Sequence, residues 1–471
     1  MRKIRKKTKI VATIGPVSDS KEVMKKLIDN GLNIARLNFS HGDYNSHKQK
    51  IDILKELIDE GENIAIMLDT KGPEVRTGLF KDGFISFNKG DISRITVDDI
   101  IGDKKRFSVS YKGLYKDVKV GDILRLDDGR LSLRIIEKDN SNKELVLKAL
   151  NSHTIKDRRN VVAPFSRLAL PFVSKKDEED IIFGCKNDVD FIATSFTRTP
   201  KDILDVRKVL EKEGNHHIQI IAKIENYEGY KNAASILEVA DGLMVARGDL
   251  GVEVNPEEVP IIQKELVDLA NKMGKIVIVA THMLDSMQNN PTPTRAEVSD
   301  VANAIYEGCD SIMLSGESAS GNFPVESVAM ERRIASRIES ILDYHKLAEK
   351  GYQRTNGDHN DAIAYAVANA VLLSKVELII CFSKTGSTAR RISYYRPKCP
   401  IISVCDDKKV VRSLCLNWGV YGYYLKKEPY NQKEIAIGIA KEYGLKKGSK
   451  IVITGGNGKG STNFMMIEEI V

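Results

Sequence analysis

Short apolar runs that end in polar residues alternate with amphipathic stretches of helical period along this 471-residue chain. The runs are bounded by turn residues and are apolar throughout, which is typical of strands buried on both faces of a parallel sheet. Strand–helix–strand units of this length predict right-handed crossovers, and eight of them predict an α/β fold, a (β/α)8 TIM barrel. The strands are expected at residues 9–13, 34–38, 64–69, 191–196, 218–225, 242–247, 275–281 and 311–316. Helices are expected to begin at Ser20, Ser174 and Thr294.

The pattern changes twice along the chain. Between residues 73 and 169 it becomes short and alternating, with turn dipeptides such as Asp82-Gly83 and no helical stretch, which predicts an inserted all-β domain, a small β-barrel lid. The catalytic barrel is therefore expected to comprise residues 1–72 and 170–340. Residues 341–471 return to alternating strands and helices and are expected to form a C-terminal α/β effector-binding domain.

Composition narrows the class of protein. The chain is 42% hydrophobic and 29% charged, as in globular proteins, and its net charge of +7 is spread without the aromatic stripe of a nucleic-acid binder. Its six cysteines show no zinc-site spacing, and we expect them to be reduced. No apolar run has the length of a membrane span or a signal core. We therefore expect a cytoplasmic protein that binds neither nucleic acid nor membrane.

Two neighbouring predicted strands end in residues suited to phosphoryl transfer. Lys223 and Glu225 are two residues apart, so their side chains point to the same face of the strand. The next strand leads into Asp249, and the two carboxylates are hard oxygen ligands suited to Mg²⁺, with Lys223 placed where negative charge would gather. Either strand alone is equally well explained by an ordinary salt bridge, and the other six strands decide between the two interpretations.

The other strands also end in polar residues. The residues expected at the eight carboxyl ends are Thr13, Asn38, Asp69, Ser195, Lys223 with Glu225, Arg247 with Asp249, Thr281, and Ser315 with Glu317. The carboxyl ends of the strands of a TIM barrel meet at one face, and active sites lie there. Polar loop residues alone do not account for this concentration of charge, so we predict a phosphoryl-transfer site at this face.

The C-terminal region carries a candidate site for an anion. A predicted strand at 378–382 leads into Ser383, Lys384, Thr385, Gly386, Ser387 and Thr388, which open a helix. Hydroxyl, lysine and glycine residues at a helix N-terminus bind phosphate through backbone N–H groups and the helix dipole. A second glycine-rich segment, 454–461, resembles a P-loop without matching its spacing. Each segment alone is more often a simple turn, and the presence of both favours an anionic effector.

Several motifs together resemble the pyruvate kinase family over essentially the whole chain. The segments that carry the resemblance are Thr13-Ile-Gly-Pro16, Ala35-Arg-Leu-Asn-Phe-Ser-His-Gly42, Leu68-Asp-Thr-Lys-Gly-Pro-Glu-Val-Arg-Thr-Gly78, Ala222-Lys-Ile-Glu-Asn226, Met244-Val-Ala-Arg-Gly-Asp-Leu-Gly251, Ala280-Thr-His-Met-Leu-Asp-Ser-Met287, Thr294-Arg-Ala-Glu297 and Met313-Leu-Ser-Gly-Glu-Ser318. The resemblance implies transfer of the phosphoryl group of phosphoenolpyruvate to ADP, giving pyruvate and ATP with Mg²⁺ and K⁺, in a homotetramer regulated by a phosphorylated allosteric effector.

Carried onto matching positions, the resemblance assigns roles to the strand-end residues. Glu225 and Asp249 would hold Mg²⁺, Lys223 would stabilise the transferring group and the enolate, and Arg36 would bind the phosphoryl group. The substrate carboxylate would be held by Thr281 and the backbone of Ala246, Arg247, Gly248 and Asp249. Ser315 and Glu317 would belong to the network that supplies a proton to the enolate.

The resemblance also implies sites for K⁺ and nucleotide. The K⁺ ligands would be the oxygen donors Asn38, Ser40, Asp69 and Thr70, and the nucleotide contacts Asn38, His41, Arg76 and Arg159. An acidic residue at Glu74 accompanies K⁺ dependence in this family, where a lysine accompanies independence. We therefore expect K⁺ activation.

The sequence departs from the family where the inserted domain ends, since Asn160-Val-Val-Ala-Pro-Phe165 stands in place of the usual Gly-Val-Asn-Leu-Pro-Gly. Arg159 occupies the position of a common nucleotide-binding lysine. No phosphohistidine-type domain is expected after residue 471. Two alternatives remain: a Mg²⁺-dependent lyase on a phosphoenolpyruvate/pyruvate-type barrel, and a catalytically silent barrel. The lyase needs no inserted domain, and the silent barrel predicts loss of at least one of Lys223, Glu225, Asp249 or Thr281.

Overall fold

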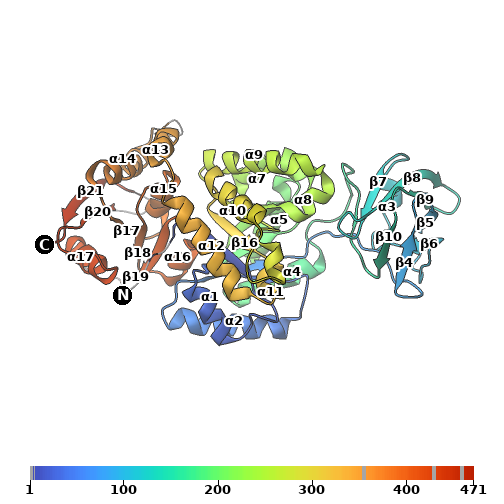
Figure 1. Ribbon diagram of the computed structural model, residues 1–471, viewed down its shortest axis with the longest axis horizontal. Coiled ribbons are helices and arrows are strands. Elements are labelled where there is room, and N and C mark those ends of the chain that lie inside the picture. The colour runs from blue at the N-terminus through green and yellow to red at the C-terminus, as the bar shows by residue number, and fades with distance from the viewer. Residues whose placement is uncertain (1–3, 5, 353–356, 427–430, 457–460) are drawn as a thin grey trace.

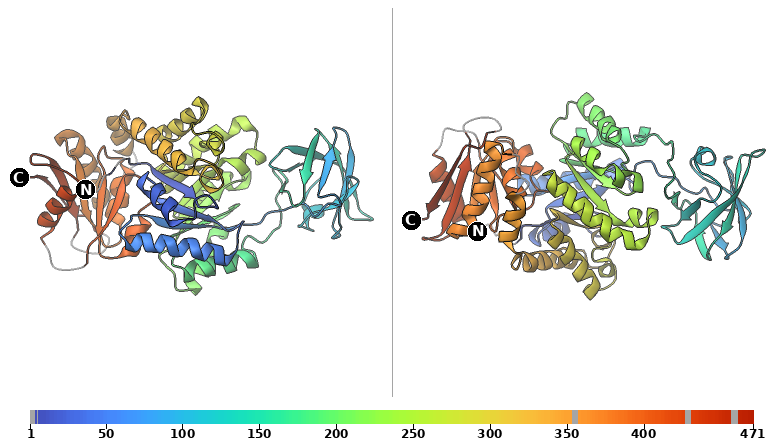
Figure 2. Two further views of the ribbon diagram at one scale, coloured as in Figure 1. Left: turned by 60° about the horizontal axis from the view of Figure 1, so that its bottom comes forward. Right: turned by 90° about the horizontal axis from the view of Figure 1, so that it is seen from above.

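Three structural units lie in a row in the molecule (Figure 1). The computed structural model describes the chain except for residues 1–3, 5, 353–356, 427–430 and 457–460. A barrel lies in the middle, an all-β unit projects from one end, and an α/β unit lies at the other end with both chain termini beside it. The further views in Figure 2 show the same arrangement. No helix in the described part of the chain has the length and apolar character needed to span a membrane.

The middle unit is a closed parallel barrel, which confirms the predicted fold class. Its eight strands are paired in the order β1-β16-β15-β14-β13-β12-β3-β2. Buried side chains such as Met67, Phe191, Ile221 and Met244 fill its interior. The strands are β1 (Lys9–Thr13), β2 (Ile34–Asn38), β3 (Ala65–Asp69), β12 (Phe191–Thr194), β13 (Gln219–Ile224), β14 (Gly242–Ala246), β15 (Ile276–Ala280) and β16 (Ser311–Leu314).

Helices surround the barrel and pack apolar faces against the strands. Ser20, Ser174 and Thr294 cap three of them, as predicted: Ser20 Oγ accepts from the Val23 N–H at 3.3 Å, and the other two form capping boxes. The helices are α1 (Lys21–Asp29), α2 (Tyr44–Asp59), α4 (Lys175–Lys186), α5 (Pro200–Lys212), α6 (Tyr227–Lys231), α7 (Ala233–Val239), α8 (Arg247–Glu253), η1 (Pro256–Glu258), α9 (Val259–Lys272), η2 (Asp285–Gln288), α10 (Arg295–Glu307), α11 (Gly316–Ala319) and α12 (Pro324–Glu339).

The chain between β3 and α4 forms the separate all-β unit, which we call the lid domain. A six-stranded sheet, β11-β7-β8-β9-β5-β6, and a two-stranded sheet, β10-β4, share one apolar core. The prediction that this region has no helix is wrong by one turn, α3 (Leu114–Asp117), which forms because buried Leu114 packs into that core. The strands are β4 (Phe84–Phe87), β5 (Ile92–Thr96), β6 (Arg106–Ser108), β7 (Ile123–Leu126), β8 (Leu131–Asp139), β9 (Glu144–Ala149), β10 (His153–Lys156) and β11 (Val161–Val162).

The C-terminal unit is an α/β domain with sheet order β19-β18-β17-β20-β21, in which only the β20–β21 pairing is antiparallel. It closes the bottom of the barrel: Cys415 and Leu416 join the barrel's interior cluster, and Lys9 Nζ donates to the Val420 carbonyl. All six cysteines are buried and unpaired. The elements are α13 (Tyr344–Tyr352), α14 (His359–Ser374), β17 (Leu378–Phe382), α15 (Ser387–Tyr394), β18 (Ile401–Cys405), α16 (Lys408–Ser413), β19 (Val420–Tyr424), α17 (Gln432–Glu442), β20 (Lys450–Gly455) and β21 (Phe464–Glu469).

Candidate active site

Four charged side chains meet inside the barrel at the carboxyl ends of β2, β3 and β13. Arg36 Nε lies 2.6 Å from Asp69 Oδ2, and Lys223 Nζ lies 3.0 Å from Asp69 Oδ1 and 3.1 Å from Glu225 Oε1. All four residues are buried. The same-face prediction for Lys223 and Glu225 agrees with this contact, and Asp69 joins Lys223 to Arg36.

Ser195 connects this cluster to the end of β3. Lys223 Nζ donates to Ser195 Oγ at 2.7 Å, and Ser195 Oγ lies 2.6 Å from the Thr70 carbonyl and 3.1 Å from Asp69 Oδ1. This proximity arises because β12 pairs with β3, with Ala193 opposite Asp69. The sequence placed Ser195 at a strand end but assigned it no role, since a lone serine carries no motif of its own.

The charges of the cluster depend on one another. Burial raises the pKa of Glu225 to about 7, and the charges of Asp249 and Asp69 add to that rise against the opposing Lys223. Burial also raises the pKa of Asp249. Burial alone would lower the pKa of Lys223, but Asp69 and Glu225 outweigh it and the pKa is raised. The Lys223 ammonium is therefore held charged, but it does not fully compensate the negative charges of Glu225 and Asp249, whose pKa values are raised.

Glu225 and Asp249 fit a divalent cation of the Mg²⁺ type. Glu225 is buried and Asp249 is partly buried, and their desolvated negative charges are the surplus that such an ion would neutralise. Within the described residues no group of three or more His, Cys, Asp and Glu side chains is arranged to hold a metal. Mg²⁺ usually takes only one or two carboxylates and leaves its other positions to water and substrate oxygens. This donor set therefore suits Mg²⁺ better than a metal that needs an all-protein cage.

The ends of β14 and β15 form a second wall. Arg247 turns away from the cluster: its Nη1 lies 2.7 Å from Asp300 Oδ1, and its Nη2 donates to the Thr281 carbonyl at 2.6 Å. Thr281 itself adopts a positive φ of 76°, which is costly for a β-branched residue. Gly248 makes this approach possible, because a Cβ there would lie 2.8 Å from Thr281 Cγ2. Because its side chain is engaged by these contacts, Arg247 can offer a ligand beside Thr281 only its backbone.

Glu317 fastens the ends of β15 and β16 together. Its buried carboxylate accepts from the Leu284 N–H at 3.1 Å and from the Ser315 N–H at 2.8 Å. The predicted pair Ser315 and Glu317 is thus brought together, with the serine contributing its backbone.

The four predicted K⁺ ligands gather where β2 and β3 end. Asn38 lies opposite Asp69 in the β2–β3 register, and Asn38 Oδ1 accepts from the Ser40 N–H at 3.1 Å. Thr70 follows Asp69 directly, and its Oγ1 accepts from the Ser195 N–H at 3.2 Å. Their oxygen atoms therefore belong to one region of the site.

The predicted nucleotide contacts lie on two units. Arg76 and Arg159 occupy the two segments that join the lid domain to the barrel, and the Thr77 N–H donates to the Arg159 carbonyl at 2.8 Å. Arg76 pairs with Glu74 at 2.8 Å, and Arg159 lies 3.4 Å from Asp127 of the lid domain. His41 is exposed on the barrel side. The structure brings the two arginines together and places His41 on a separate element.

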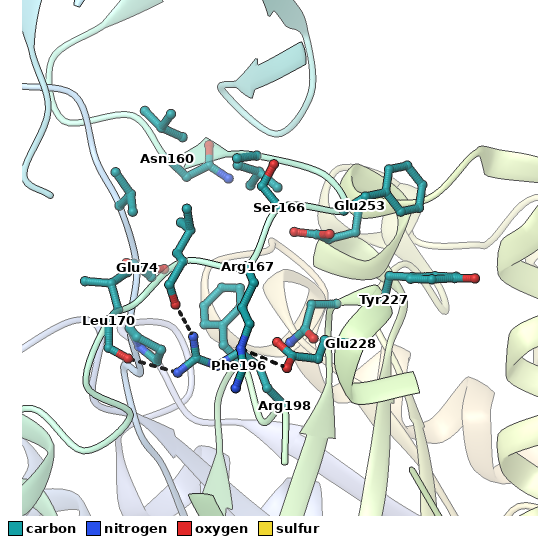
Figure 3. Close-up of a pocket in the computed structure, with 18 of the residues that line it drawn as sticks. Glu74, Asn160, Ser166, Arg167, Leu170, Phe196, Arg198, Tyr227, Glu228 and Glu253 are labelled. Atoms are coloured by element: carbon teal, nitrogen blue, oxygen red, sulfur yellow. Dashed lines mark hydrogen bonds and ion pairs between the residues drawn. The ribbon is translucent and has the colours of Figure 1, made fainter. Parts of the chain in front are cut away.

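A cavity of about 490 Å³ lies where the lid domain joins the barrel, and the sequence analysis did not foresee it (Figure 3). The Phe165 and Tyr227 rings meet edge to face at 5.2 Å, and Arg198 donates to the Leu168 and Leu170 carbonyls at 2.7 and 3.0 Å. These contacts hold the segment that leads from the lid domain back to the barrel against the barrel. Burial raises the pKa of Glu253 in this cavity to about 7.

Residues 383–386 connect β17 to α15, and Ser387 and Thr388 are the first two residues of α15, so the segment opens a helix as predicted. Gly386 has a φ of 77°, and the exposed Lys384 and Thr385 precede the first turn of α15. Thr388 Oγ1 lies 2.6 Å from Thr462 Oγ1, so the loop contacts the segment after the second glycine-rich stretch. Residues 457–460 of that stretch lie outside the described residues.

Two family models match the chain in sequence order: the pyruvate kinase barrel domain over residues 5–328 and the pyruvate kinase alpha/beta domain over residues 361–468. The chain belongs to the pyruvate kinase family. It is 46% identical over 469 residues to the pyruvate kinase of Staphylococcus haemolyticus and 45% identical over 470 residues to that of Staphylococcus saprophyticus; each match covers 98% of this chain and 80% of the relative. A crystal structure of a pyruvate kinase from Cryptosporidium parvum superposes with a TM-score of 0.93 and 37% identity, covering 99% of this chain and 97% of the other.

Family membership makes this protein a phosphotransferase, and the resemblance drawn from the motifs is confirmed. The lyase alternative is not favoured, because both halves of the chain match pyruvate kinase models. Lys223, Glu225, Asp249 and Thr281, whose loss the silent-barrel alternative predicts, are all present.

Proposed function

We propose that this protein transfers the phosphoryl group of phosphoenolpyruvate to ADP, giving pyruvate and ATP, with Mg²⁺ held by Glu225 and Asp249 and with K⁺ as a second cofactor. The observation that carries the proposal is the buried cluster in which Lys223 and Arg36 flank Asp69 at the strand ends. Two fixed cations in a desolvated site stabilise charge that develops on a transferring phosphoryl group without reorganisation during the reaction.

Each residue then has one task. Arg36, oriented by Thr13 Oγ1 at 2.7 Å and by Asp69, binds the phosphoryl oxygens. Lys223 keeps its proton because Asp69 and Glu225 raise its pKa, and this ammonium group faces the enolate oxygen. The backbone from Ala246 to Asp249, with Thr281, binds the substrate carboxylate. Mg²⁺, held by Glu225 and Asp249, would supply Lewis-acid chemistry.

The proton that converts the enolate to pyruvate would reach it through the network of Ser315 and Glu317. The position of both residues at the end of β16 supports this role. There the buried Glu317 carboxylate accepts a hydrogen bond from the Leu284 N–H, which belongs to the loop that follows Thr281. Nucleotide would contact Asn38, His41, Arg76 and Arg159, so that closure of the lid domain encloses it.

K⁺ would bind among Asn38, Ser40, Asp69 and Thr70, and the acidic Glu74 follows Thr70 four residues further along the chain. A lysine in place of Glu74 would supply a fixed positive charge instead, which is the physical reason to link Glu74 with K⁺ dependence. We further propose that a phosphorylated effector binds at residues 383–388, where hydroxyls and Lys384 surround the N-terminus of α15, and that the protein is a cytoplasmic homotetramer.

The test measures pyruvate formed from phosphoenolpyruvate, ADP and Mg²⁺ in K⁺ and in Na⁺ buffers. We expect turnover in K⁺ that collapses in Na⁺ and in Lys223→Met. Lys275→Met is the matched control, because Lys275 Nζ donates to the Ala240 carbonyl at 2.7 Å, away from the cluster. Equal turnover in both salts would refute the K⁺ assignment alone, and no pyruvate in either salt would refute the reaction.

A further inference from the structure

Arg159 is fixed at its backbone and faces a carboxylate with one edge of its guanidinium. Its N–H donates to Thr77 Oγ1 at 2.9 Å, and its carbonyl accepts from the Thr77 N–H at 2.8 Å, so the two segments that join the lid domain to the barrel hold each other. Its Nε lies 3.4 Å from Asp127 Oδ1. At this distance the buried Nε has no hydrogen-bond partner among the described residues, and the side chain is 41% exposed. The guanidinium is therefore accessible to a ligand, and Asp127 is the group that orients it.

Asp127 is placed in turn by His153. The Asp127 side chain is buried, and its second oxygen, Oδ2, lies 2.8 Å from His153 Nε2. A buried carboxylate needs such a partner, because an unpaired charge away from water is costly. Since an ionised carboxylate only accepts hydrogen bonds, the imidazole donates through its Nε2–H. The carboxylate of Asp127 thus joins the imidazole of His153 to the guanidinium of Arg159.

The turn that carries Asp127 is held by other contacts as well. His153 is the first residue of β10, whereas Asp127 follows β7 and Arg159 lies shortly before β11. Asp127 and Asp128 have positive φ values of 53° and 56°, which a short polar side chain tolerates when its neighbours hold it. Asn160 does so: its Oδ1 accepts from the Asp128 N–H at 2.9 Å, and its Nδ2 donates to Asp128 Oδ1 at 3.0 Å. The backbone of the turn therefore has its own support, and the contact with His153 determines where the Asp127 carboxylate points.

An arginine at position 159 depends on this orientation more than a lysine would. A lysine ammonium is a point charge with rotatable donors, whereas a guanidinium is planar and donates in a fixed fork. The fork binds two phosphate oxygens at once only when its plane faces them. A carboxylate that is shared with His153 can hold the Nε edge of Arg159 and leave the remaining N–H groups for a phosphate.

We propose that His153 is a positioning residue for nucleotide binding: it holds the Asp127 carboxylate so that this carboxylate orients the Arg159 guanidinium toward the nucleotide phosphates. The inference rests on the proposed contact of Arg159 with nucleotide, and it adds two residues of the lid domain, His153 and Asp127, to that side of the site. Without the bond from His153, the Asp127 carboxylate is free to turn and to cover the N–H groups that the phosphates need.

The experiment uses a matched pair of substitutions at His153. The amide nitrogen of His153→Gln reaches the place of the imidazole Nε2 and keeps the donor, whereas the shorter amide of His153→Asn lies near the place of Nδ1 and withdraws it. We expect His153→Asn to raise the KM for ADP by roughly tenfold, as loss of a hydrogen bond to a charged group does. His153→Gln should leave the KM for ADP within about twofold of the unaltered value. The KM for phosphoenolpyruvate should stay the same in both variants, because Arg159 does not contact that substrate in the proposed mechanism.

A double-mutant cycle with Arg159→Met separates positioning from a general effect on the lid domain. Arg159→Met alone should raise the KM for ADP, and adding His153→Asn should raise it by no more than about a further twofold, because His153 acts through Arg159. Additive effects, or an unchanged KM for ADP in His153→Asn, overturn the inference and leave the proposed reaction standing. An unchanged KM for ADP in Arg159→Met shows instead that the proposed nucleotide contact of Arg159 is wrong, and the inference fails with it.

Calorimetric titration with ATP provides a second readout that does not depend on turnover. His153→Asn should bind ATP more weakly than the unaltered protein, and the control His345→Asn, which changes an exposed residue of α13, should bind it equally well. Should His153→Asn fail to fold, crystals of the unaltered protein with ATP decide the matter. Asp127 in contact with both His153 and Arg159, with Arg159 on a phosphate oxygen, supports the proposal, and an Asp127 that has left either partner refutes it.

Discussion

Replacement of Ser195 by alanine should slow the reaction while leaving the fold intact. Lys223 Nζ donates to Asp69 Oδ1 at 3.0 Å and to Ser195 Oγ at 2.7 Å, and it forms an ion pair with Glu225 Oε1 at 3.1 Å. The substitution removes the shortest of these bonds and also the donor to the Thr70 carbonyl at 2.6 Å. The ammonium would then shift toward its two carboxylates and away from the reacting oxygen.

The expected size follows from the type of bond lost. A buried hydrogen bond to a charged group contributes about 1.5–3 kcal/mol. If that free energy is lost from the transition state, kcat falls by roughly 10- to 150-fold, since about 1.4 kcal/mol corresponds to a factor of ten. The KM for phosphoenolpyruvate should change less, because in the proposed mechanism Arg36 and the backbone near Thr281 bind the substrate.

The measurement is the initial rate of pyruvate formation at saturating phosphoenolpyruvate, with unfolding by urea recorded in parallel. Ser235→Ala is the control, because Ser235 Oγ donates to the Asn232 carbonyl at 2.9 Å on α7 and does not touch the cluster. A kcat within about twofold of the unaltered protein, together with a lowered unfolding free energy, would show that Ser195 serves the fold alone and would refute the reasoning.

Three further predictions concern residues away from the lysine. Arg125→Met removes the lid-domain guanidinium that donates to the Val252 and Val254 carbonyls at the end of α8, so kcat/KM for phosphoenolpyruvate should fall by about tenfold. The control Arg134→Met changes an exposed residue and should match the unaltered enzyme. Equal effects of both substitutions would contradict a role of Arg125 in holding the lid domain against α8. Burial raises the pKa of Asp190 to about 6, so the native state holds more protons than the unfolded state between pH of about 4 and 6. The unfolding free energy should therefore fall as the pH rises through that window. Urea titrations at each pH should show a less steep fall in Asp190→Asn. Arg247→Met removes the hydrogen bond to the Thr281 carbonyl, which should lower the unfolding free energy by about 1.5–3 kcal/mol and raise the KM for phosphoenolpyruvate. The control Arg333→Met changes an exposed residue and should alter neither quantity.

The apolar patterns were sufficient for the barrel because a buried parallel strand is recognisable by itself. Each predicted strand lies within two residues of an observed one, and Ser20, Ser174 and Thr294 cap the expected helices. The one-turn helix α3 was not predictable, since four residues have no helical period to detect and burial of Leu114 in the lid-domain core holds the turn.

The sequence by itself determined which residues stand at the strand ends, because side chains alternate along a strand and all parallel strands point their carboxyl ends to one face. It thereby brought Asp69, Lys223 and Glu225 into one candidate site, to which the family resemblance added Arg36. Which of them touch was decided only by closure of the barrel. β12 lies beside β3 although the whole lid domain separates them in the chain, and that pairing carries Ser195 to Lys223.

The same holds for side chains that leave the site or meet across domains. Arg247 follows a strand that ends at the active site, yet it turns to Asp300 and the Thr281 carbonyl because those acceptors lie beside it only in the folded barrel. The buried Lys9 of β1 donates to the Val420 carbonyl of the C-terminal domain, and no local pattern records that contact. Local sequence fixes the direction and period of each element, whereas the partner of a buried charge depends on contacts between segments far apart in the chain.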